Sequence, residues 1–501
     1  MTSQRTKQAE RVLTEFSHFF DRAPVAADPA LADAPVTDGA GVLSLFERMR
    51  TRVPAYRHFL EEHGCTETEL AELEDLRKLP VCTKQNYHRA YPLPALCWDG
   101  RLEACDMLAV SSGSTGEPTV WPRSVTDELG TTERFEQVLV SGFNADRRPT
   151  LAVVCFALGS WVGGMYTTAA CRHLAAKGYP ITVVTPGNNP SEILRIVAAI
   201  GHMFEQVVLL GYPPFVKDVV DAGCARGLDW PRYRVKLVLA GEVFSEAWRE
   251  LVCERLGESE PWLATASLYG TADGGVLANE TPLSIQIRHA LSEHPALARE
   301  LFGEPRLPTL CQYDPRHRYF EVVDGQLLFS GDGGAPLMRY NILDRGGVIT
   351  YAEMRAFLDA NGLGSKLPQR GTPLPFVYVF GRTNFAVSYY GANVYPENVA
   401  IGLEQPEFAD HVTGKFVLEV VEDAALNARL KLSVELVAGA AADLDDLARR
   451  LQTSVVRQLC SVNSEFANYV PVAAREPEIN LLPLGDPNYF PPGVKHRYTR
   501  H

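Results

Sequence analysis

The stretch MLAVSSGSTGEPTVWP, residues 107–122, places serine, threonine and glycine directly behind a short apolar segment. A strand that leads into such a loop is suited to wrap phosphate groups, because hydroxyls and backbone N–H groups donate while glycine lets the backbone approach. The loop has neither the GxxxxGK[ST] pattern of a Walker P-loop nor the GxSxG pattern of a nucleophile elbow. It also carries Glu117, although phosphate-binding loops usually carry a cation. Alone it is a weak signal for nucleotide binding, so its meaning depends on the rest of the chain.

The composition is typical of a globular protein, and the charge argues against nucleic acid as a partner. The chain has 501 residues, which predicts two or more domains. Its formal net charge of −13 argues against nucleic acid and anionic membranes as partners. The N-terminus has no apolar signal core, and the longest apolar run, residues 151–158, is far shorter than the roughly 20 residues of a membrane span. We therefore expect a cytoplasmic protein with no membrane partner.

The ten cysteines are scattered without a CxxC pair, which argues against a zinc ribbon or a redox motif. We expect free thiols in a reducing cytoplasm. Cys311 and His317 lie six residues apart and could contribute to a metal site, although two ligands make a weak case.

The apolar pattern predicts an α/β fold. Residues 1–100 read as mostly helical. From 107 to 275, short β-branched runs alternate with amphipathic stretches, which predicts a parallel sheet covered by helices. The runs are Leu151–Phe156, Ile181–Thr185, Gln206–Leu210 and Val235–Ala240.

After residue 275 the sequence pattern changes. We expect residues 281–317 to form a helix and then a loop, and residues 319–331 and 346–353 to form strands of a small β-rich unit. Glycine and proline make residues 361–375 a connector. We place the domain boundary after residue 381, with a large N-terminal α/β domain over 1–381 and a small, mobile α+β domain over 382–501.

Two elements of the C-terminal part are predicted in detail. Residues 429–437 alternate as a half-buried strand, and Asp443 stands where a helix N-cap is expected. One face of that helix carries an apolar stripe that we assign to the core, namely Leu444, Leu447, Leu451, Val455 and Leu459.

Four more motifs follow the serine-rich loop in order. They are AGEVFS at 240–245, SLYGTADGG at 267–275, PLMRYNILD at 336–344 and GRTN at 381–384. The ordered set resembles the adenylate-forming superfamily of acyl-CoA synthetases, adenylation domains and luciferases. The superfamily signatures run [ST]-[ST]-G-[ST]-T-G-K-P, G-x-E, Y-G-x-[ST]-E, R-Y-x-x-G-D and G-R-x-D.

The beginning of the chain narrows this resemblance. VPAY at 53–56 and LPVCTKQ at 79–85 look like the opening of phenylacetate-CoA ligase relatives. That branch also contains deazaflavin-cofactor adenylyltransferases and ATP-dependent diazotases. The resemblance covers nearly the whole chain.

The resemblance implies a site for ATP and Mg²⁺. Glu242, Tyr269 and Gly270 would lie around the adenine, Asp344 would accept hydrogen bonds from the ribose hydroxyls, and Arg382 would contact ribose or phosphate from the hinge. Asp273 stands where the family has a glutamate that binds Mg²⁺. The other implied ATP-binding residues are Ser111, Ser112, Gly113, Ser114, Thr115, Gly116, Gly241 and Thr271.

The substrate pocket is expected in FALGSWVGGMY, residues 156–166. Trp161, Gly163 and Tyr166 would bind the substrate there, and the two aromatic rings would wall an aromatic acid. A packing role for Trp161 and Tyr166 stays open, because glycine and aromatic residues also mark close helix contacts.

Several positions depart from the family pattern. Glu117 replaces the loop lysine, Ala272 lacks a hydroxyl, Asp273 is one methylene shorter than glutamate, and Asn384 replaces the hinge aspartate. Arg123 or Lys84 could supply the missing cation. Lys495, one residue beyond an ungapped match to the final family motif, is the candidate catalytic lysine, with a plain basic tail as the alternative.

These observations predict an AMP-forming ligase that needs ATP and Mg²⁺. It would activate a small aromatic carboxylic acid as its AMP ester, with CoA as a candidate acceptor. One alternative is adenylation of a non-carboxylate oxygen, either nitrite in the diazotisation of an aryl amine or a hydroxylated cofactor. A second alternative is a homologue that binds nucleotide without turnover. A homodimer is compatible with the sequence.

Overall fold

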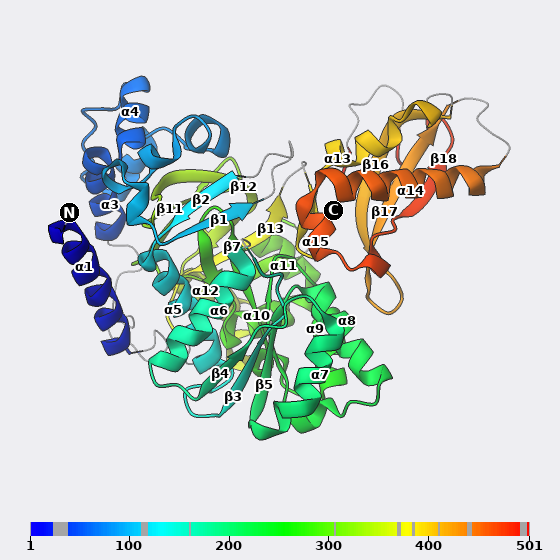
Figure 1. The fold of residues 1–501 in the computed structure, drawn as a ribbon, viewed down its shortest axis with the longest axis horizontal. Coiled ribbons are helices and arrows are strands. Elements are labelled where there is room, and N and C mark those ends of the chain that lie inside the picture. Colours follow the sequence, from blue (N-terminus) through cyan, green and yellow to red (C-terminus); the bar gives the residue numbers. More distant parts are fainter. Residues whose placement is uncertain are drawn as a thin grey trace. The chain divides into compact units, whose positions relative to one another are not determined.

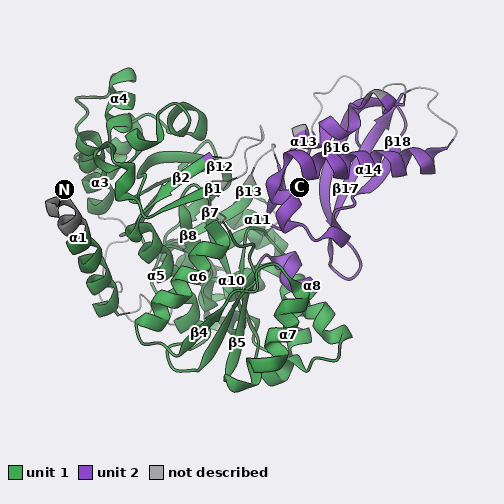
Figure 2. Ribbon diagram, in the orientation of Figure 1, with its two compact units in different colours: residues 1–110, 120–211, 219–381 green, residues 111–119, 212–218, 382–501 purple. Residues whose placement is uncertain are grey.

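The computed structural model describes residues 2–23, 39–111, 119–159, 162–304, 307–367, 372–382, 386–408, 411–437, 443–490 and 498–499. It divides into two compact units, shown in different colours in Figure 2. The first comprises residues 1–110, 120–211 and 219–381, and the second residues 111–119, 212–218 and 382–501.

The first unit is built on an 11-stranded sheet in the order β10-β11-β12-β13-β9-β8-β7-β6-β5-β3-β4 (Figure 1). Strands β4, β3, β5, β6 and β7 are parallel neighbours, whereas β8 runs antiparallel to β7. The bounds are β3 Thr150–Val154, β4 Ile181–Val184, β5 Gln206–Gly211, β6 Lys236–Ala240, β7 Thr265–Thr271, β8 Gly275–Asn279, β9 Thr309–Gln312, β10 Arg318–Val323, β11 Gln326–Gly331, β12 Leu337–Ile349 and β13 Phe376–Arg382. The predicted α/β class is confirmed, and the four predicted runs form β3 to β6 within two residues of the expected ends.

Two details of the prediction were wrong. Residues 309–312, expected in a loop, form β9 between β8 and β13. The strands assigned to a small β-rich unit, which correspond to β10, β11 and the end of β12, continue the main sheet. A strand as short as β9 gives no readable alternation, and both its central residues, Leu310 and Cys311, are fully buried.

Helices connect and cover these strands. Several helices begin at side-chain caps: Asn189 and Ser245 each accept a hydrogen bond from the N–H three residues on, and Thr281 and Thr350 form capping boxes. The helices up to residue 360 are α1 Thr2–Asp21, α3 Ala40–Arg52, α4 Pro54–Glu62, α5 Val125–Ser141, α6 Val162–Ala176, α7 Pro190–Ile200, α8 Pro213–Ala225, α9 Glu246–Leu256, α10 Pro282–Ser292, α11 Pro295–Phe302 and α12 Tyr351–Ala360. In the described part of the chain, no helix is long and apolar enough to cross a membrane.

The strand order locates the ligand-binding edge of the sheet. The chain runs from β3 to the edge strand β4 and then returns past β3 to β5, so the strand order reverses between β3 and β5. In open α/β sheets ligands bind beyond the carboxyl ends of the strands near such a reversal. The segments that follow β6 and β7 therefore lie at the edge where a ligand is expected.

The second unit has its own small sheet. Its strands are β16 Val412–Glu422, β17 Ala428–Leu436 and β18 Glu478–Leu482, with β16 antiparallel and β18 parallel to β17. The hairpin β14 Val387–Tyr389 and β15 Ala392–Val394 and the helices α13 Pro396–Leu403, α14 Leu444–Val462 and α15 Ser464–Tyr469 complete it. The predicted cap is confirmed, since Asp443 Oδ1 accepts from the Asp446 N–H at 3.0 Å. The apolar stripe is buried except for Leu444 in the first turn, which is 45% exposed.

A buried ionic network ties the helices to the ligand-binding edge. Arg249 donates to Glu246 at 3.0 Å and to Glu280 at 2.8 Å. The second oxygen of Glu280 accepts from the Ser267 N–H at 2.7 Å, so the network also holds strand β7. Arg288 of α10 pairs with Glu246. Each buried charge is thus compensated, as burial requires.

We expect Arg249→Met to lower the unfolding free energy by about 3–5 kcal/mol, because Glu280 would stay buried without its cation. Urea unfolding followed by far-UV circular dichroism measures this change. Arg195→Met is the control, since Arg195 forms an exposed pair with Glu192 and such pairs contribute little. Unchanged stability of Arg249→Met would contradict the compensating role of Arg249.

Candidate active site

Two tyrosine–aspartate hydrogen bonds connect the end of β7 to β12. Tyr269 Oη donates to Asp344 Oδ2 at 2.7 Å, and Tyr340 Oη donates to Asp273 Oδ2 at 2.8 Å. Each segment supplies one tyrosine and, four residues later, one aspartate, so the two bonds are reciprocal. All four residues are buried, where hydrogen bonds to a carboxylate are strong. The carboxylate predicted to bind ribose, Asp344, is therefore held by the end of β7. The one predicted to bind Mg²⁺, Asp273, is held by β12.

Lys84 lies beside one of these carboxylates. Its Nζ is 3.8 Å from Asp273 Oδ1 and 5.6 Å from the centre of the Trp121 ring. The first distance is longer than a hydrogen bond but short enough for an ion pair in a partly buried place. The structure therefore brings one of the two candidate substitute cations to the predicted metal-binding aspartate.

Local sequence explains how Lys84 reaches this position. Thr83 and Asn86 form a reciprocal capping box, with Thr83 N–H donating to Asn86 Oδ1 at 2.6 Å and Asn86 N–H to Thr83 Oγ1 at 3.1 Å. Just before it, Cys82 pairs with β12 through backbone bonds to Arg339 and Asn341. The segment is thus attached to the strand that carries Tyr340.

Arg123 is the other candidate cation, and it reaches the same turn. It ends β2 (Thr119–Arg123), which pairs with β1 (Met107–Ser111) across the serine-rich loop. Its guanidinium donates to the Ala272 carbonyl and, at 3.2 Å, to Asp127 Oδ1. Both candidate cations therefore lie at the residues that surround Asp273.

Sequence reasoning missed His88. Its ring contacts Trp121 with centroids 3.7 Å apart and the ring planes tilted by 39°, and only 6% of the residue is exposed. Burial lowers the pKa of His88 to about 4, against the opposing effect of Asp273, while Lys84 and Arg123 lower it further. The ring is therefore neutral at neutral pH. In the sequence, the only sign of this role is that His88 comes four residues after Lys84.

The carboxyl ends of β6 and β7 carry residues predicted to bind ATP, of which Glu242 and Gly270 are predicted to lie around the adenine. Gly241 directly follows β6 and has φ 92°, a conformation that glycine adopts without strain. Glu242, next to it, is half-buried. Gly270 and Thr271 end β7, and Thr271 Oγ1 accepts from the Gly274 N–H at 2.9 Å. Because β6 and β7 are parallel neighbours, these residues share one edge of the sheet.

The predicted substrate residues lie around the start of α6. Gly163 is half-buried in its first turn, and a Cβ at Gly164 would come within 2.3 Å of the Ala157 carbonyl. Helix α6 therefore packs directly on the segment that follows β3. Tyr166 is buried, burial raises its pKa well above the ordinary value, and its hydroxyl has no hydrogen-bond partner among the described residues.

Several predicted residues lie outside the described part of the chain, so their roles stay predictions. For Ser111 and Arg382 the structure describes the backbone, at the ends of β1 and β13, but not the side chain. The residues outside are Ser112, Gly113, Ser114, Thr115, Gly116, Glu117, Trp161, Asn384 and Lys495.

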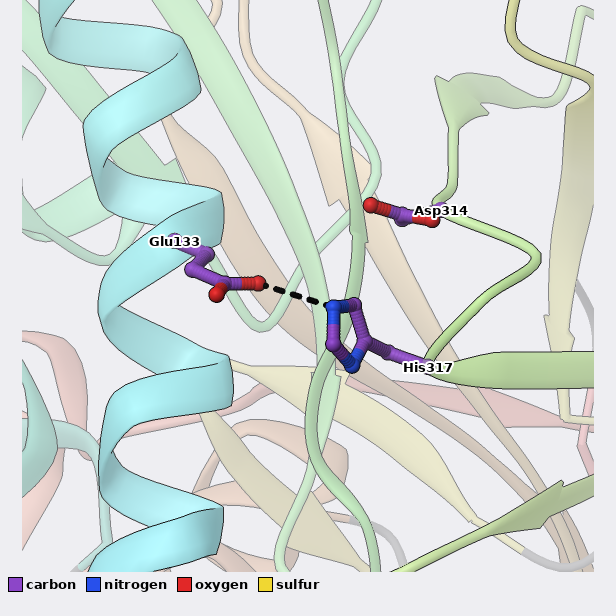
Figure 3. A group of neighbouring side chains, drawn as sticks. All are labelled: Glu133, Asp314 and His317. Carbon is purple, nitrogen blue, oxygen red and sulfur yellow. Dashed lines mark ion pairs between the residues drawn. The ribbon is translucent and has the colours of Figure 1, made fainter. Parts of the chain in front are cut away.

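Figure 3 shows a group with the composition of a metal site, formed by Glu133 of α5 with Asp314 and His317. Its possible ligand atoms lie within 4.8 Å of one another. However, Arg22 is 2.6 Å from Glu133 Oε1, and Arg316 is 2.7 Å from Asp314 Oδ2. These arginines supply the positive charge that a metal would bring, so we interpret the group as an ion-pair network.

The group contains only one of the two residues, Cys311 and His317, that the sequence suggested as metal ligands. His317 meets Glu133 at 3.2 Å, whereas Cys311 is fully buried in β9 and is not part of the group. Burial also raises the pKa of the Cys311 thiol well above its ordinary value, which disfavours the thiolate that binds metals.

A further feature missed from the sequence is the backbone at Leu343. It has φ 67°, in the left-handed region that favours glycine, and the family motif R-Y-x-x-G-D has glycine there. The Leu343 N–H donates to Asn341 Oδ1 at 2.7 Å, which supports the turn. This turn directly precedes Asp344.

No family model matches the chain. The phenylacetate-coenzyme A ligase of Thermus thermophilus is 28% identical over 368 residues, covering 72% of this chain and 73% of that protein. The phenylacetate-coenzyme A ligase of Escherichia coli is 23% identical over 395 residues, covering 77% and 78%.

Solved structures show the same fold. The crystal structure of 2-hydroxyisobutyryl-CoA ligase in complex with 2-HIB-AMP and CoA in the thioesterification state has a TM-score of 0.64 at 15% identity, covering 96% of this chain and 94% of that chain. The same ligase in the postadenylation state with 2-HIB-AMP has a TM-score of 0.54 at 14% identity, covering 96% and 93%.

The depressed pKa of His88 predicts that acid destabilises this part of the protein. Between about pH 6.5 and pH 4 the unfolded state binds a proton that the folded state does not, so stability falls as the pH falls through that window. Moving from pH 7 to pH 4.5 should cost about 2–3 kcal/mol through His88. Urea unfolding measures the free energy of unfolding at both pH values. The decrease between pH 7 and pH 4.5 should be smaller in His88→Gln than in the wild type by that amount.

The control for this experiment is His58→Gln, because the His58 side chain is 57% exposed. It should keep the wild-type difference between the two pH values. If His88→Gln also kept that difference, the ring of His88 would not be the group that resists protonation.

Proposed function

We propose that this chain, as a member of the adenylate-forming superfamily in its phenylacetate-CoA ligase-like branch, is an AMP-forming ligase that activates a small aromatic carboxylic acid with ATP and passes the acyl group to CoA. The substrate carboxylate would attack the α-phosphorus of ATP, release pyrophosphate and form the acyl-AMP. The CoA thiol would then attack the acyl carbonyl, giving the thioester and AMP.

The observation that carries this proposal is the reciprocal pair of tyrosine–aspartate hydrogen bonds. It fixes Asp344 and Asp273 through Tyr269 and Tyr340, at the edge of the sheet where nucleotides bind in open α/β folds. An acceptor carboxylate suits the two ribose hydroxyls, which is the role we propose for Asp344. A preformed pair of carboxylates requires no rearrangement when ATP arrives, which lowers the cost of binding.

Asp273 also fits the Mg²⁺ that this chemistry requires. Its carboxylate is a hard oxygen ligand, and while Oδ2 accepts from Tyr340, Oδ1 is 3.8 Å from Lys84 Nζ. Bound Mg²⁺ would neutralise charge on the phosphates. With one methylene less than glutamate, Asp273 has a shorter reach, so its backbone must be held in place accurately.

We propose that Lys84 replaces the positive charge that the serine-rich loop lacks. Two unit charges at 4 Å attract by about 4 kcal/mol at the effective dielectric constant of a protein surface. Lys84 is held by a capping box and half-buried over Trp121, so its ammonium group costs little to order when ATP binds. Arg123 adds a second positive charge behind the same turn.

Support for an aromatic acid comes from α6. Tyr166 is a buried ring in the second turn of α6, the helix that comes after β3 in the chain, beside the point where the strand order reverses. Aromatic walls with few polar groups are typical of small-molecule sites. Trp161 and Gly163 complete the proposed pocket, and Lys495, Arg382 and Asn384 are proposed to act from the C-terminal region during the two half-reactions.

The test is pyrophosphate release with ATP, Mg²⁺ and a panel of aryl and aliphatic acids, with and without CoA. Parallel reactions contain aryl amines and nitrite. Release that depends on an aryl acid, together with a CoA thioester seen by mass spectrometry, supports the proposal. Release that depends on nitrite and an amine, and is indifferent to CoA, indicates a diazotase. Nucleotide binding without release in any reaction indicates a non-catalytic homologue.

We expect Lys84→Met to lower kcat/KM for ATP by about tenfold or more, which corresponds to about 1.4 kcal/mol of lost attraction for the phosphates. Steady-state pyrophosphate release measures it. Lys78→Met is the matched control, since Lys78 lies on the same segment with 60% of its side chain exposed. Equal kinetics for the two variants would contradict the role of Lys84.

A further inference from the structure

The turn that carries Asp273 is held on both sides by arginine side chains. Arg123 donates to the carbonyl of Ala272, and Arg318 donates through Nη2 to the carbonyl of Gly274 at 3.3 Å. These are the carbonyl groups of the residues immediately before and after Asp273. Arg123 ends β2 and Arg318 begins β10, so the two come from distant parts of the chain.

Each arginine is itself fixed. Arg123 Nη1 donates to Asp127 Oδ1 at 3.2 Å, and Asp127 Oδ2 accepts from the Ser124 and Gly334 N–H groups, each at 2.7 Å. Arg318 Nη1 donates to the carbonyls of His317 and Asp332 at 3.1 and 3.2 Å. Burial lowers the pKa of Arg318, because a buried position disfavours the charged form of the guanidinium.

Close backbone approach around these side chains requires glycine. A Cβ at Gly331 would come within 2.5 Å of Arg318 Nη1, and a Cβ at Gly333 within 2.3 Å of Asp127 Oδ1. Neither position therefore tolerates a larger residue while the side chains of Arg318 and Asp127 stay where they are. The glycines make room for the arginine contacts rather than for a turn.

Packing and directional bonds restrain the turn together. Ala272 packs against the hydrophobic core, and a Cβ at Gly274 would come within 2.7 Å of the Phe329 ring and 2.8 Å of Leu277. The bonds that Arg123 and Arg318 donate to the Ala272 and Gly274 carbonyls add a directional restraint on the backbone on either side of Asp273.

We propose that Arg123 and Arg318 are positioning residues that hold Asp273 in place to bind the divalent cation of the nucleotide. This inference rests on the proposed function and adds two residues to it. The side chain of Asp273 is shorter than that of the glutamate in the family motif. The bonds from Arg123 and Arg318 compensate for this, because they keep the backbone at Asp273 from moving away from the cation. Groups that orient a metal ligand in this way typically change metal affinity by about 10–100-fold when they are altered.

The test measures metal binding directly. Mn²⁺ replaces Mg²⁺, the nucleotide is α,β-methylene-ATP, which cannot release pyrophosphate, and electron paramagnetic resonance counts free Mn²⁺. Arg318→Lys and Arg123→Lys should each raise the Mn²⁺ dissociation constant about tenfold. Binding of the nucleotide at saturating Mn²⁺ should stay close to that of the wild type.

Two controls separate positioning from general damage. Arg475→Lys changes another arginine that donates to two backbone carbonyls, at 2.9 and 2.7 Å, and it should leave Mn²⁺ binding unchanged. Thermal unfolding confirms that each variant is folded. If Arg123→Lys fails to fold, Arg318→Lys still tests the proposal, because the acceptors of Arg318 are carbonyls and no carboxylate loses its partner.

The outcomes are distinct. Unchanged Mn²⁺ binding in a folded Arg318→Lys would overturn the positioning role and leave the proposed function intact. A wild-type protein that binds the nucleotide but no Mn²⁺ would overturn the metal site itself. A tenfold higher Mn²⁺ dissociation constant in Arg318→Lys, with unchanged nucleotide binding, would support both the metal site and the positioning role.

Discussion

Two hydrogen bonds from tyrosine hydroxyls to buried carboxylates hold the end of β7 against β12, and the candidate site is arranged around them. A buried carboxylate is tolerated only where donors or cations compensate it. Here each one accepts from a tyrosine that is four residues away from the other aspartate. The arrangement places two negative groups at the ligand-binding edge of the sheet and keeps them from moving independently.

The charges around the β7–β8 turn are balanced by this arrangement. Asp273 lies between Lys84 on one side and the arginine contacts on the other. Arg123 is compensated in turn by Asp127, and the neutral ring of His88 adds no further positive charge at neutral pH. The charges of Asp273 and Arg123 are thus each compensated, as burial in a low-dielectric environment requires.

The sequence predicted the parallel strands and the cap at Asp443, because both depend on local patterns. It did not reveal β9, which is too short for alternation. Nor did it reveal that Tyr340 contacts Asp273, because that bond joins positions 67 residues apart. The Y-x-x-x-D spacing is visible twice, at Tyr269 and Tyr340, but spacing alone does not say that the segments face each other.

Arg318 and His88 were missed for the same reason. Their roles depend on distant carbonyls and rings, and no pattern around them indicates a contact with the turn at Asp273. The domain boundary after residue 381 and the roles of the serine-rich loop, Asn384 and Lys495 stay predictions.

The most direct test of the reciprocal pair is a double-mutant cycle in acid-dependent ATP–pyrophosphate exchange, with Tyr269→Phe, Tyr340→Phe and the double variant. Either bond alone still joins the two segments, whereas losing both releases them. The double variant should therefore lose more exchange activity than the product of the two single losses, by about 0.5–3 kcal/mol of coupling. Losses that simply multiply would contradict a shared role and would make each tyrosine an independent support of its own aspartate.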